Sequence, residues 1–180
     1  MALPIHSGGR RALGRSMKYD SVDHVSYSVS DLDTSIGFYT LLFDEKPFLR
    51  KTWTEEYGSR LCGYENVILE GAFWQLPQGP VFELLEFKSP GAESVELEIY
   101  KAGSSHLGLV CGNLEEEFAR LRTAGVTFQS QEVIDIPWGP YKGGRAVFAR
   151  DPDGIFIELI QLPPGGTALG AERSPDLADA

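Results

Sequence analysis

The sequence has little of three things that often narrow the class of a protein: cysteine, long apolar runs and, over most of its length, positive charge. Cys62 and Cys111 are the two cysteines among 180 residues. Two cysteines are too few for a disulfide framework, so we expect free thiols in a reducing compartment and a cytoplasmic location. No apolar run approaches the roughly 18 residues that a membrane-spanning helix needs. These shortages disfavour both a disulfide scaffold and a membrane protein.

Positive charge is scarce in the middle of the chain. Residues 19–162 contain 11 Lys and Arg against 23 Asp and Glu, which opposes binding to nucleic acid or to an anionic membrane. Residues 1–18 have no acidic residue and no apolar segment of a secretion signal, so we expect a flexible leader. From Pro163 onward the composition follows no period, and residues 163–180 are expected to form a disordered tail. One domain over residues 19–162 remains.

Two segments each place one glutamate in an apolar strand behind a tight turn. Residues 151–160 contain a Pro-Asp-Gly turn followed by a strand that includes Glu158. Residues 76–85 repeat the spacing, with a Pro, one residue, a Gly and then Glu83 four residues after that Gly. A carboxylate in an apolar strand is costly unless something pairs with it. The shared offset therefore indicates a shared role.

Two further segments place one histidine in an alternating strand that leads directly into a helix. Residues 22–29 alternate with His24 on one face, and residues 105–111 do the same with His106. Asp31 and Asn113 are suited to cap the two helices that follow. When His106 is superposed on His24, three apolar helix positions coincide, namely Leu114 with Leu32, Phe118 with Ile36 and Leu121 with Tyr39. The chain is therefore an internal repeat.

The repeat predicts two modules, 19–88 and 104–162, joined by a linker over 89–103. The spacing from His to Glu is 59 residues in the first module and 52 in the second, so seven extra residues lie within 46–75. Aromatic and β-branched residues in 46–54 and 58–75 predict two or three strands there. Loops between these strands can absorb the extra length.

Two His and two Glu at symmetric offsets indicate a metal site. An approximate two-fold axis can bring one His and one Glu from each module to a shared cleft. Imidazole and carboxylate ligands suit a divalent ion of Ni, Zn, Co, Mn or Fe, and a six-coordinate ion keeps two positions for water or substrate. Small residues share the histidine face and apolar residues share the glutamate face, as in a ligand pocket. These are Ser26, Ser28 and Gly108 on the first, and Leu85, Phe87, Phe156 and Ile160 on the second.

Five motifs resemble the vicinal oxygen chelate superfamily, which groups glyoxalase I, methylmalonyl-CoA epimerase, extradiol dioxygenases and fosfomycin or bleomycin resistance proteins. They are Val22-Asp23-His24-Val25, Asp31-Leu32 with Phe38-Tyr39, Phe82-Glu83-Leu84, His106-Leu107-Gly108-Leu109, and Asp151-Pro152-Asp153-Gly154 with Ile157-Glu158-Leu159. The resemblance implies an α+β fold of two βαβββ modules that form an incomplete mixed-sheet barrel around a metal-binding cleft. It also implies that the metal ligands are His24, Glu83, His106 and Glu158.

The four-ligand set is similar to that of bacterial glyoxalase I, whereas extradiol dioxygenases use two His and one Glu. Residues 139–144 also resemble the Gly-Pro-x-Lys-Gly-Gly loop of glyoxalase I, where the lysine lies near the carboxylate of the thiol cofactor. The segment after Glu83 lacks the Asn-Trp pair that glyoxalase I has there. The expected substrate-binding residues are Lys142, Tyr141, Trp138, Phe87 and Phe156.

The expected activity is that of a metal-dependent lyase or isomerase of glyoxalase type. A small-molecule substrate with two neighbouring oxygens chelates the ion, which stabilises an enediolate, and Glu158 or Glu83 moves the proton. One alternative is an Fe(II) extradiol dioxygenase that cleaves a catechol, with Tyr141 or Trp138 lining the aromatic site. Another is a resistance-type protein that binds a ligand without turnover. Whether the site lies within one chain or across a homodimer stays open.

Overall fold

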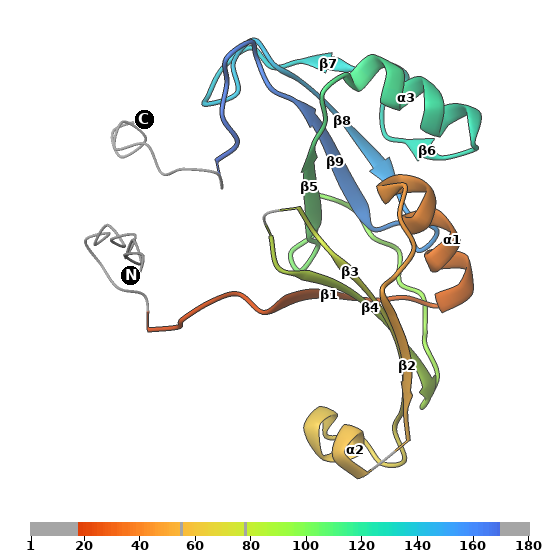
Figure 1. Cartoon of the computed structure of the whole chain (residues 1–180). Coiled ribbons are helices and arrows are strands. Elements are labelled where there is room, and N and C mark those ends of the chain that lie inside the picture. The colour runs from red at the N-terminus through yellow and green to blue at the C-terminus, as the bar shows by residue number, and fades with distance from the viewer. Residues whose placement is uncertain (1–17, 55, 78, 170–180) are drawn as a thin grey trace, which may run out of the picture.

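The computed structural model describes residues 18–54, 56–77 and 79–169. Within these ranges the chain forms two modules, each with a mixed sheet and a long helix (Figure 1). The first module comprises β1 (His24–Ser28), α1 (Leu32–Phe43), β2 (Leu49–Trp53), α2 (Glu56–Cys62), β3 (Ile68–Gln75) and β4 (Val81–Ser89). The second comprises β5 (His106–Val110), α3 (Leu114–Thr123), β6 (Thr127–Phe128), β7 (Ile134–Asp135), β8 (Arg145–Arg150) and β9 (Phe156–Gln161).

The two sheets have the same topology, which confirms the internal repeat. Sheet A has the strand order β1-β4-β3-β2, and sheet B has the order β5-β9-β8-β6 with β7 also paired to β8. In each sheet the histidine strand runs parallel to the glutamate strand, and the other pairs are antiparallel. The expected α+β class with mixed sheets is confirmed. Over the described residues the sheets do not close into a barrel.

Both long helices begin where the sequence predicts. The Asp31 carboxylate accepts a hydrogen bond from the Thr34 N–H at 2.7 Å, and the Asn113 side chain accepts one from the Glu116 N–H at 3.4 Å. These caps satisfy N–H groups that have no partner in the first helical turn. After α3 the chain reverses at Gly125, whose φ of +90° favours glycine.

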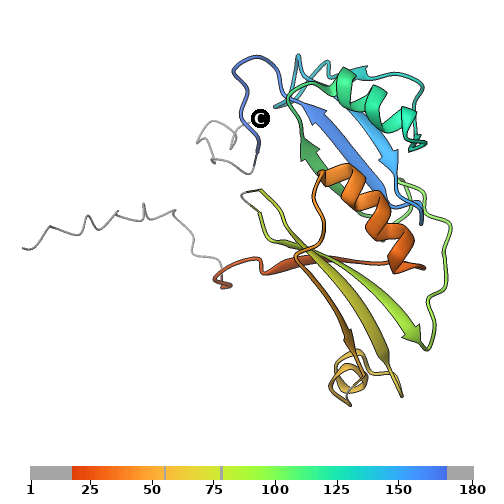
Figure 2. The ribbon, with the colours of Figure 1, turned by 45° about the vertical axis from the view of Figure 1, so that its right-hand side comes forward.

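The two modules share one core. Figures 1 and 2 both show α1 lying between sheet A and sheet B. Its buried side chains pack together with apolar residues of α3 and of the inner face of each sheet, among them Leu32, Tyr39, Phe82, Leu84, Leu114, Leu121, Ile157 and Leu159. The Tyr39 hydroxyl also donates a hydrogen bond to the Asp151 carboxylate at 3.1 Å, from one module to the other. Because one face of each sheet packs into this core, the histidine and glutamate of each module lie on the opposite face.

The structure corrects the expectation for residues 58–75, because residues up to Cys62 belong to the helix α2. Gly58 of this helix faces the sheet, where a Cβ would make ordinary contacts of 3.6 Å with Val67 Cγ1 and 3.9 Å with Leu69 Cδ1. The helix ends at Gly63, which has a φ of +76°. Gly63 therefore marks the end of the helix, which strand alternation alone does not reveal.

The ends of the chain fall mostly outside the described residues. The expected leader lies there except for Lys18, and so does the expected tail from residue 170 onward. In the linker, Ser89 is still part of β4, and residues 90–103 contain neither helix nor strand. None of the described helices is long and apolar enough to cross a membrane.

Candidate metal centre

His24 and Glu83 form a pair on the face of sheet A that points away from the shared core. The His24 Nε2 lies 3.6 Å from Glu83 Oε2. The parallel register sets this approach, because Ser26, two residues after His24, is the partner of Glu83. The other ring nitrogen, Nδ1, is 2.9 Å from Asp23 Oδ2. This hydrogen bond orients the imidazole and raises the pKa of His24 above its ordinary value.

His106 and Glu158 repeat the arrangement on sheet B. The His106 Nε2 lies 3.3 Å from Glu158 Oε2, and Gly108 takes the place of Ser26 opposite the glutamate. A Cβ on Gly108 would lie 4.0 Å from Glu158 Oε2, so a small residue keeps the carboxylate free to turn toward the histidine. Each module therefore builds the same His/Glu pair from the same strand pairing.

The two pairs do not meet within one chain. They lie on different sheets, and no group of three or more His, Cys, Asp or Glu that could hold a metal occurs in residues 18–54, 56–77 and 79–169. The structure thus brings together His24 with Glu83 and His106 with Glu158, while the four side chains stay apart as two half-sites.

Each half-site fits two ligands of one divalent ion. Imidazole nitrogen and carboxylate oxygen bind zinc at about 2.0–2.2 Å, so two neighbouring ligands on one ion lie about 3.0–3.5 Å apart. The observed N to O separations of 3.6 and 3.3 Å are close to that spacing. In both pairs the nitrogen that faces the carboxylate is Nε2.

The face of sheet A that carries Glu83 is called here the open face. Alternation along β4 places Leu85 and Phe87 on it beside Glu83, while Phe82, Leu84 and Glu86 point into the protein and are buried. Phe87 also lines a cavity that reaches Ser28 and Tyr64. The open face thus continues from the half-site toward α2.

Phe156 has a different environment. Phe156 is the strand partner of His106, yet its side chain is only 1% exposed. The Arg150 guanidinium lies 4.2 Å from its ring centre, and the Phe148 ring packs edge-on against it at 6.0 Å. Over the described residues Phe156 is therefore covered by its own module.

Lys142, Tyr141 and Trp138 lie on the loop between β7 and β8. The loop is a hydrogen-bonded turn in which the Lys142 N–H donates to the Gly139 carbonyl at 3.1 Å. Trp138 is 77% exposed, and the Tyr141 hydroxyl accepts a hydrogen bond from the Leu169 N–H at 3.0 Å. The loop leaves from the end of β8 that pairs with Gln161, so it stands away from Glu158 along the sheet.

Sequence reasoning missed one aromatic residue beside each half-site. Phe73 is the partner of Glu83 across β3 and β4, and Phe148 is the partner of Glu158 across β8 and β9. Each Phe precedes its Glu by ten residues, a repeat offset that was available in the sequence. Phe148 packs edge-on against the His106 ring at 5.4 Å. Each pair thus has a phenyl ring as its neighbour.

Comparison with known proteins agrees with the fold. Residues 21–159 match the family described as the glyoxalase/bleomycin resistance protein/dioxygenase superfamily. A lactoylglutathione lyase from Salmonella typhimurium is 31% identical over 158 residues, which cover 82% of this chain and 96% of that protein. The crystal structure of a glyoxalase family protein from Bacillus cereus aligns with a TM-score of 0.70 at 22% identity, over 84% of this chain and 99% of that one. A protein of the same superfamily from Frankia sp. EAN1pec aligns at 0.58 and 26%, over 82% and 95% of the two chains.

Proposed function

Because the chain belongs to the glyoxalase/bleomycin resistance protein/dioxygenase superfamily, we propose that it is a metal-dependent lyase or isomerase of glyoxalase type. The observation that carries the proposal is the pairing of Glu83 with His24 in the same register as Glu158 with His106. This duplication supports a four-ligand site, because a three-ligand oxygenase site of two His and one Glu would leave the second carboxylate without a role. The relatives named lactoylglutathione lyase support the same class of reaction.

The residues that would hold the ion are His24, Glu83, His106 and Glu158. A divalent ion bound by them would stabilise negative charge on two neighbouring oxygens of a substrate, which makes an adjacent C–H more acidic. A carboxylate that is close to this C–H can accept the proton and return it to the same or the neighbouring carbon. Glu158 and Glu83 are the candidates, with side chains that are 26% and 12% exposed. Asp23 keeps the His24 ring oriented through Nδ1.

The complete site is proposed to form between two copies of the chain. Each copy has one His24/Glu83 pair and one His106/Glu158 pair, and the described residues do not bring these pairs together. A symmetric dimer can place the first pair of one copy against the second pair of its partner, and it does so twice. Such a dimer has two equivalent four-ligand sites.

The test is complementation between two inactive variants, His24→Ala and His106→Ala. Turnover of the hemithioacetal of methylglyoxal is measured for each variant alone and after the two are unfolded together and refolded. In a mixed dimer one site loses both histidines and the other keeps all four ligands. Random pairing therefore restores about a quarter of the wild-type activity.

The control is a double variant, His24→Ala with His106→Ala, refolded with wild type. In a mixed dimer of these two chains each site lacks one histidine, so activity should follow the square of the wild-type fraction, whereas a site within one chain would make it follow the fraction itself. Metal content measured by elemental analysis should reach one ion per chain in wild type and fall in both single variants. Full activity and metal content in both single variants would contradict the proposed ligands, and inactive variants that never complement would place the site within one chain.

A further inference from the structure

The open face of sheet A carries a continuous aromatic surface that begins at Glu83. Phe73 is the direct partner of Glu83 across the antiparallel pair. Trp53 packs edge-on against Phe73 with ring centres 5.9 Å apart, and Phe48 lies on its other side at 6.3 Å. Trp53 of β2 and Phe48, which precedes β2, thus both contact Phe73 of β3, the neighbour of one carboxylate of the proposed metal centre.

Gly71 shows how closely the indole lies on the sheet. A Cβ at this position would lie 2.9 Å from Trp53 Cζ3 and 3.1 Å from Leu85 Cδ2. Glycine in the middle of a strand weakens the strand and commonly marks the close approach of another group. Here that group is the Trp53 ring. The glycine therefore lets the indole lie close to β3.

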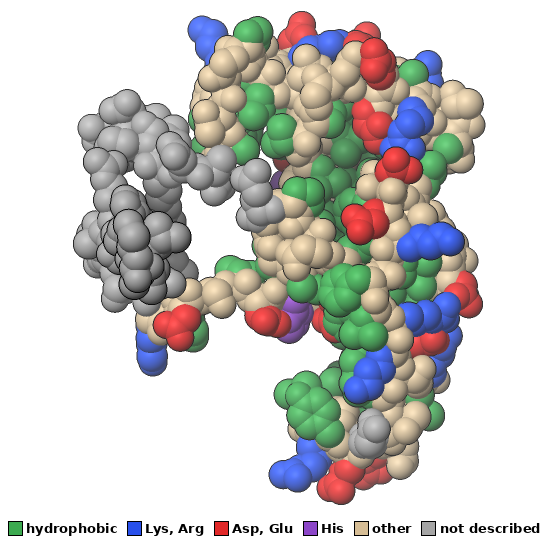
Figure 3. Space-filling model, in the orientation of Figure 1, with side chains coloured by type: hydrophobic (Ala, Val, Ile, Leu, Met, Phe, Trp, Pro, Cys, Tyr) green, Lys and Arg blue, Asp and Glu red, His purple; other side chains and the backbone are tan. Residues whose placement is uncertain are grey.

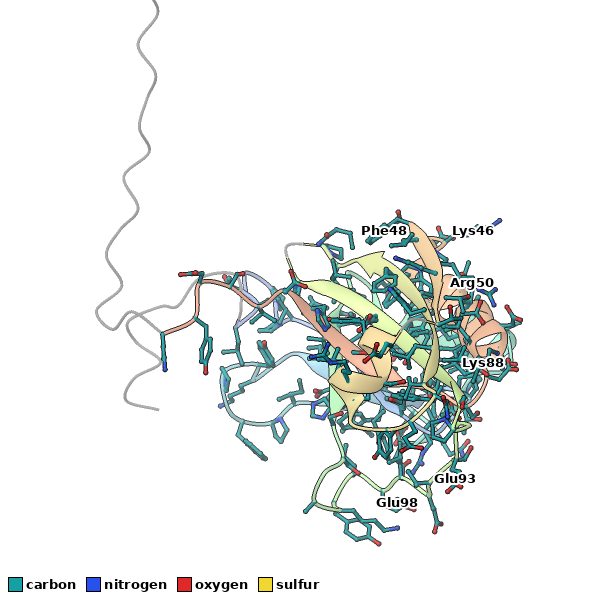
Figure 4. The ribbon with its side chains drawn as sticks, turned by 90° about the horizontal axis from the view of Figure 1, so that it is seen from below. Lys46, Phe48, Arg50, Lys88, Glu93 and Glu98 are labelled. Atoms are coloured by element: carbon teal, nitrogen blue, oxygen red, sulfur yellow. The ribbon has the colours of Figure 1, made fainter. Side chains whose placement is uncertain are left out.

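Helix α2 closes the far end of this surface. Its Gly58 packs against Leu69, which is on the open face, and Tyr64 just after the helix lines a cavity together with Phe87. Figure 3 shows the molecule hollowed between β1 and the lobe that contains α2, with hydrophobic side chains along the hollow. In Figure 4 the labelled Phe48 lies next to the start of β2. Arg50 and Lys88 belong to the opposite face of the sheet, where they pair with Asp33 of α1 and with the buried Glu86. The hollow therefore presents mainly apolar side chains.

The charges around the hollow do not match a strongly anionic ligand. The cavity lined by Tyr64 and Phe87 also contains Glu93 and Asp153, and no Lys or Arg is among its described lining residues. Lys51 contributes one amine, which lies 5.4 Å from the Trp53 ring centre. Glutathione carries two carboxylates, so this half of the site offers it little charge complementarity.

We infer that the substrate carries a planar aromatic group beside its two chelating oxygens, and that Phe73 and Trp53 determine this specificity by contact with that group. The inference rests on the proposed function, because it places the chelating oxygens at Glu83. Aromatic groups favour edge-on or offset contact with such rings. The thiol part of an adduct, where there is one, contributes little to recognition on this face.

Binding of two chelators to the full-length protein loaded with Ni²⁺ tests the inference without turnover. Tropolone is aromatic and acetohydroxamic acid is not, and both bind metal through two neighbouring oxygens. By titration calorimetry, Phe73→Leu and Trp53→Leu should each weaken tropolone binding about 3- to 10-fold, and acetohydroxamate binding less than about 2-fold. Gly71→Ala keeps every ring but displaces the indole, so it should resemble Trp53→Leu.

The control variant is Tyr100→Leu, because Tyr100 is an exposed aromatic residue of the linker, 81% exposed and outside the hollow. It should leave the affinity for both chelators unchanged. Equal losses for tropolone and acetohydroxamate in the Phe73 and Trp53 variants, or no loss for either, overturn the inference.

A panel of four substrates separates this inference from the proposed function. Adducts of methylglyoxal and phenylglyoxal are prepared with glutathione and with 2-mercaptoethanol. The phenylglyoxal adducts should have a kcat/KM about 10-fold higher or more, and the exchange of thiol should change it less than about 3-fold. Turnover that depends on glutathione and not on the phenyl group overturns the inference but supports the function. No turnover of any adduct contradicts the function, and the chelator titrations still decide the inference.

Discussion

Glu86 and Gln161 hold the same position in the two modules, and each accepts a hydrogen bond from the first N–H of its module's helix. The bond from the Leu32 N–H to Glu86 Oε2 and the bond from the Leu114 N–H to Gln161 Oε1 are both 2.8 Å. Each acceptor lies three residues after the glutamate of its half-site, on the same strand. The strand that presents the proposed ligand is therefore also the strand that anchors the helix.

Replacement of Glu86 by Ala should destabilise the protein by about 1–3 kcal/mol, because it leaves the buried Leu32 N–H without a partner. Glu86→Gln should lower the free energy of unfolding by less than about 1 kcal/mol, since the amide oxygen of Gln161 accepts the equivalent hydrogen bond in the second module. Urea unfolding followed by circular dichroism measures both. A Glu86→Ala protein as stable as wild type would show that the hydrogen bond is not needed.

Glu83→Gln and Glu158→Gln should each lower kcat at least about 100-fold while the fold and the urea midpoint stay unchanged. The amide keeps the shape of the side chain but cannot accept a proton in the same way. Glu132→Gln, at an exposed loop position, is the matched control and should keep full activity. Near-normal rates in both active-site variants would remove the proposed role of these carboxylates.

Asp151 makes the stability of the protein depend on pH. Burial raises the pKa of its carboxyl to about 6, even though N–H groups of Ile155 and Asp153 and the Tyr39 hydroxyl donate to it. A raised pKa means that the folded state holds the proton more tightly than the unfolded state. Stability from this group is therefore full below pH 3.8, falls as the pH rises toward 6, and is lost above it.

The loss amounts to about 3 kcal/mol between those limits. Asp151→Asn cannot ionise, so the difference in unfolding free energy between wild type and this variant should shift by that amount from pH 4 to pH 7. Denaturant unfolding at several pH values measures it. A difference that stays constant with pH would show that Asp151 does not titrate in this range.

Arg150 holds the linker between the modules against sheet B. Its guanidinium donates to the Leu97 carbonyl at 3.1 Å and to the Gln129 side chain at 3.1 Å, while it covers the Phe156 ring. Lysine cannot keep these contacts at once. Arg150→Lys should therefore make residues 90–103 more sensitive to limited proteolysis, while Arg122→Lys, at the end of α3, should not. Unchanged cleavage in the Arg150 variant would contradict this role.

The repeat made the two His/Glu pairs and the main strands predictable from sequence. The shared offsets placed His24 with Glu83 and His106 with Glu158 in equivalent positions, and the parallel register of the structure reproduces that pairing. The family resemblance, based on the same residues, is confirmed. Patterns within short segments were sufficient to predict the strands and the helix starts, because helix caps and strand alternation depend on residues that are close together in the sequence.

Features that depend on packing between distant residues were not predictable in the same way. Helix α2 extends to Cys62, into residues 58–75 where strands were expected, because the aromatic and β-branched content of that segment did not reveal a short helix. Phe73 was overlooked because its relation to Glu83 comes from an antiparallel partner strand. The separation of the two half-sites also depends on how the sheets pack around α1, which no local pattern records.

The shared core constrains how proteins with this fold can diverge. Tyr39 of the first module bonds to Asp151 of the second, and α1 contributes to a core that includes residues of both sheets. A change on a core face in one module must therefore be matched in the other. Over the described residues, the sheet faces that point away from the core are not coupled to each other in this way. Phe73, Trp53 and their neighbours can vary with the substrate, while the core keeps each histidine beside its glutamate.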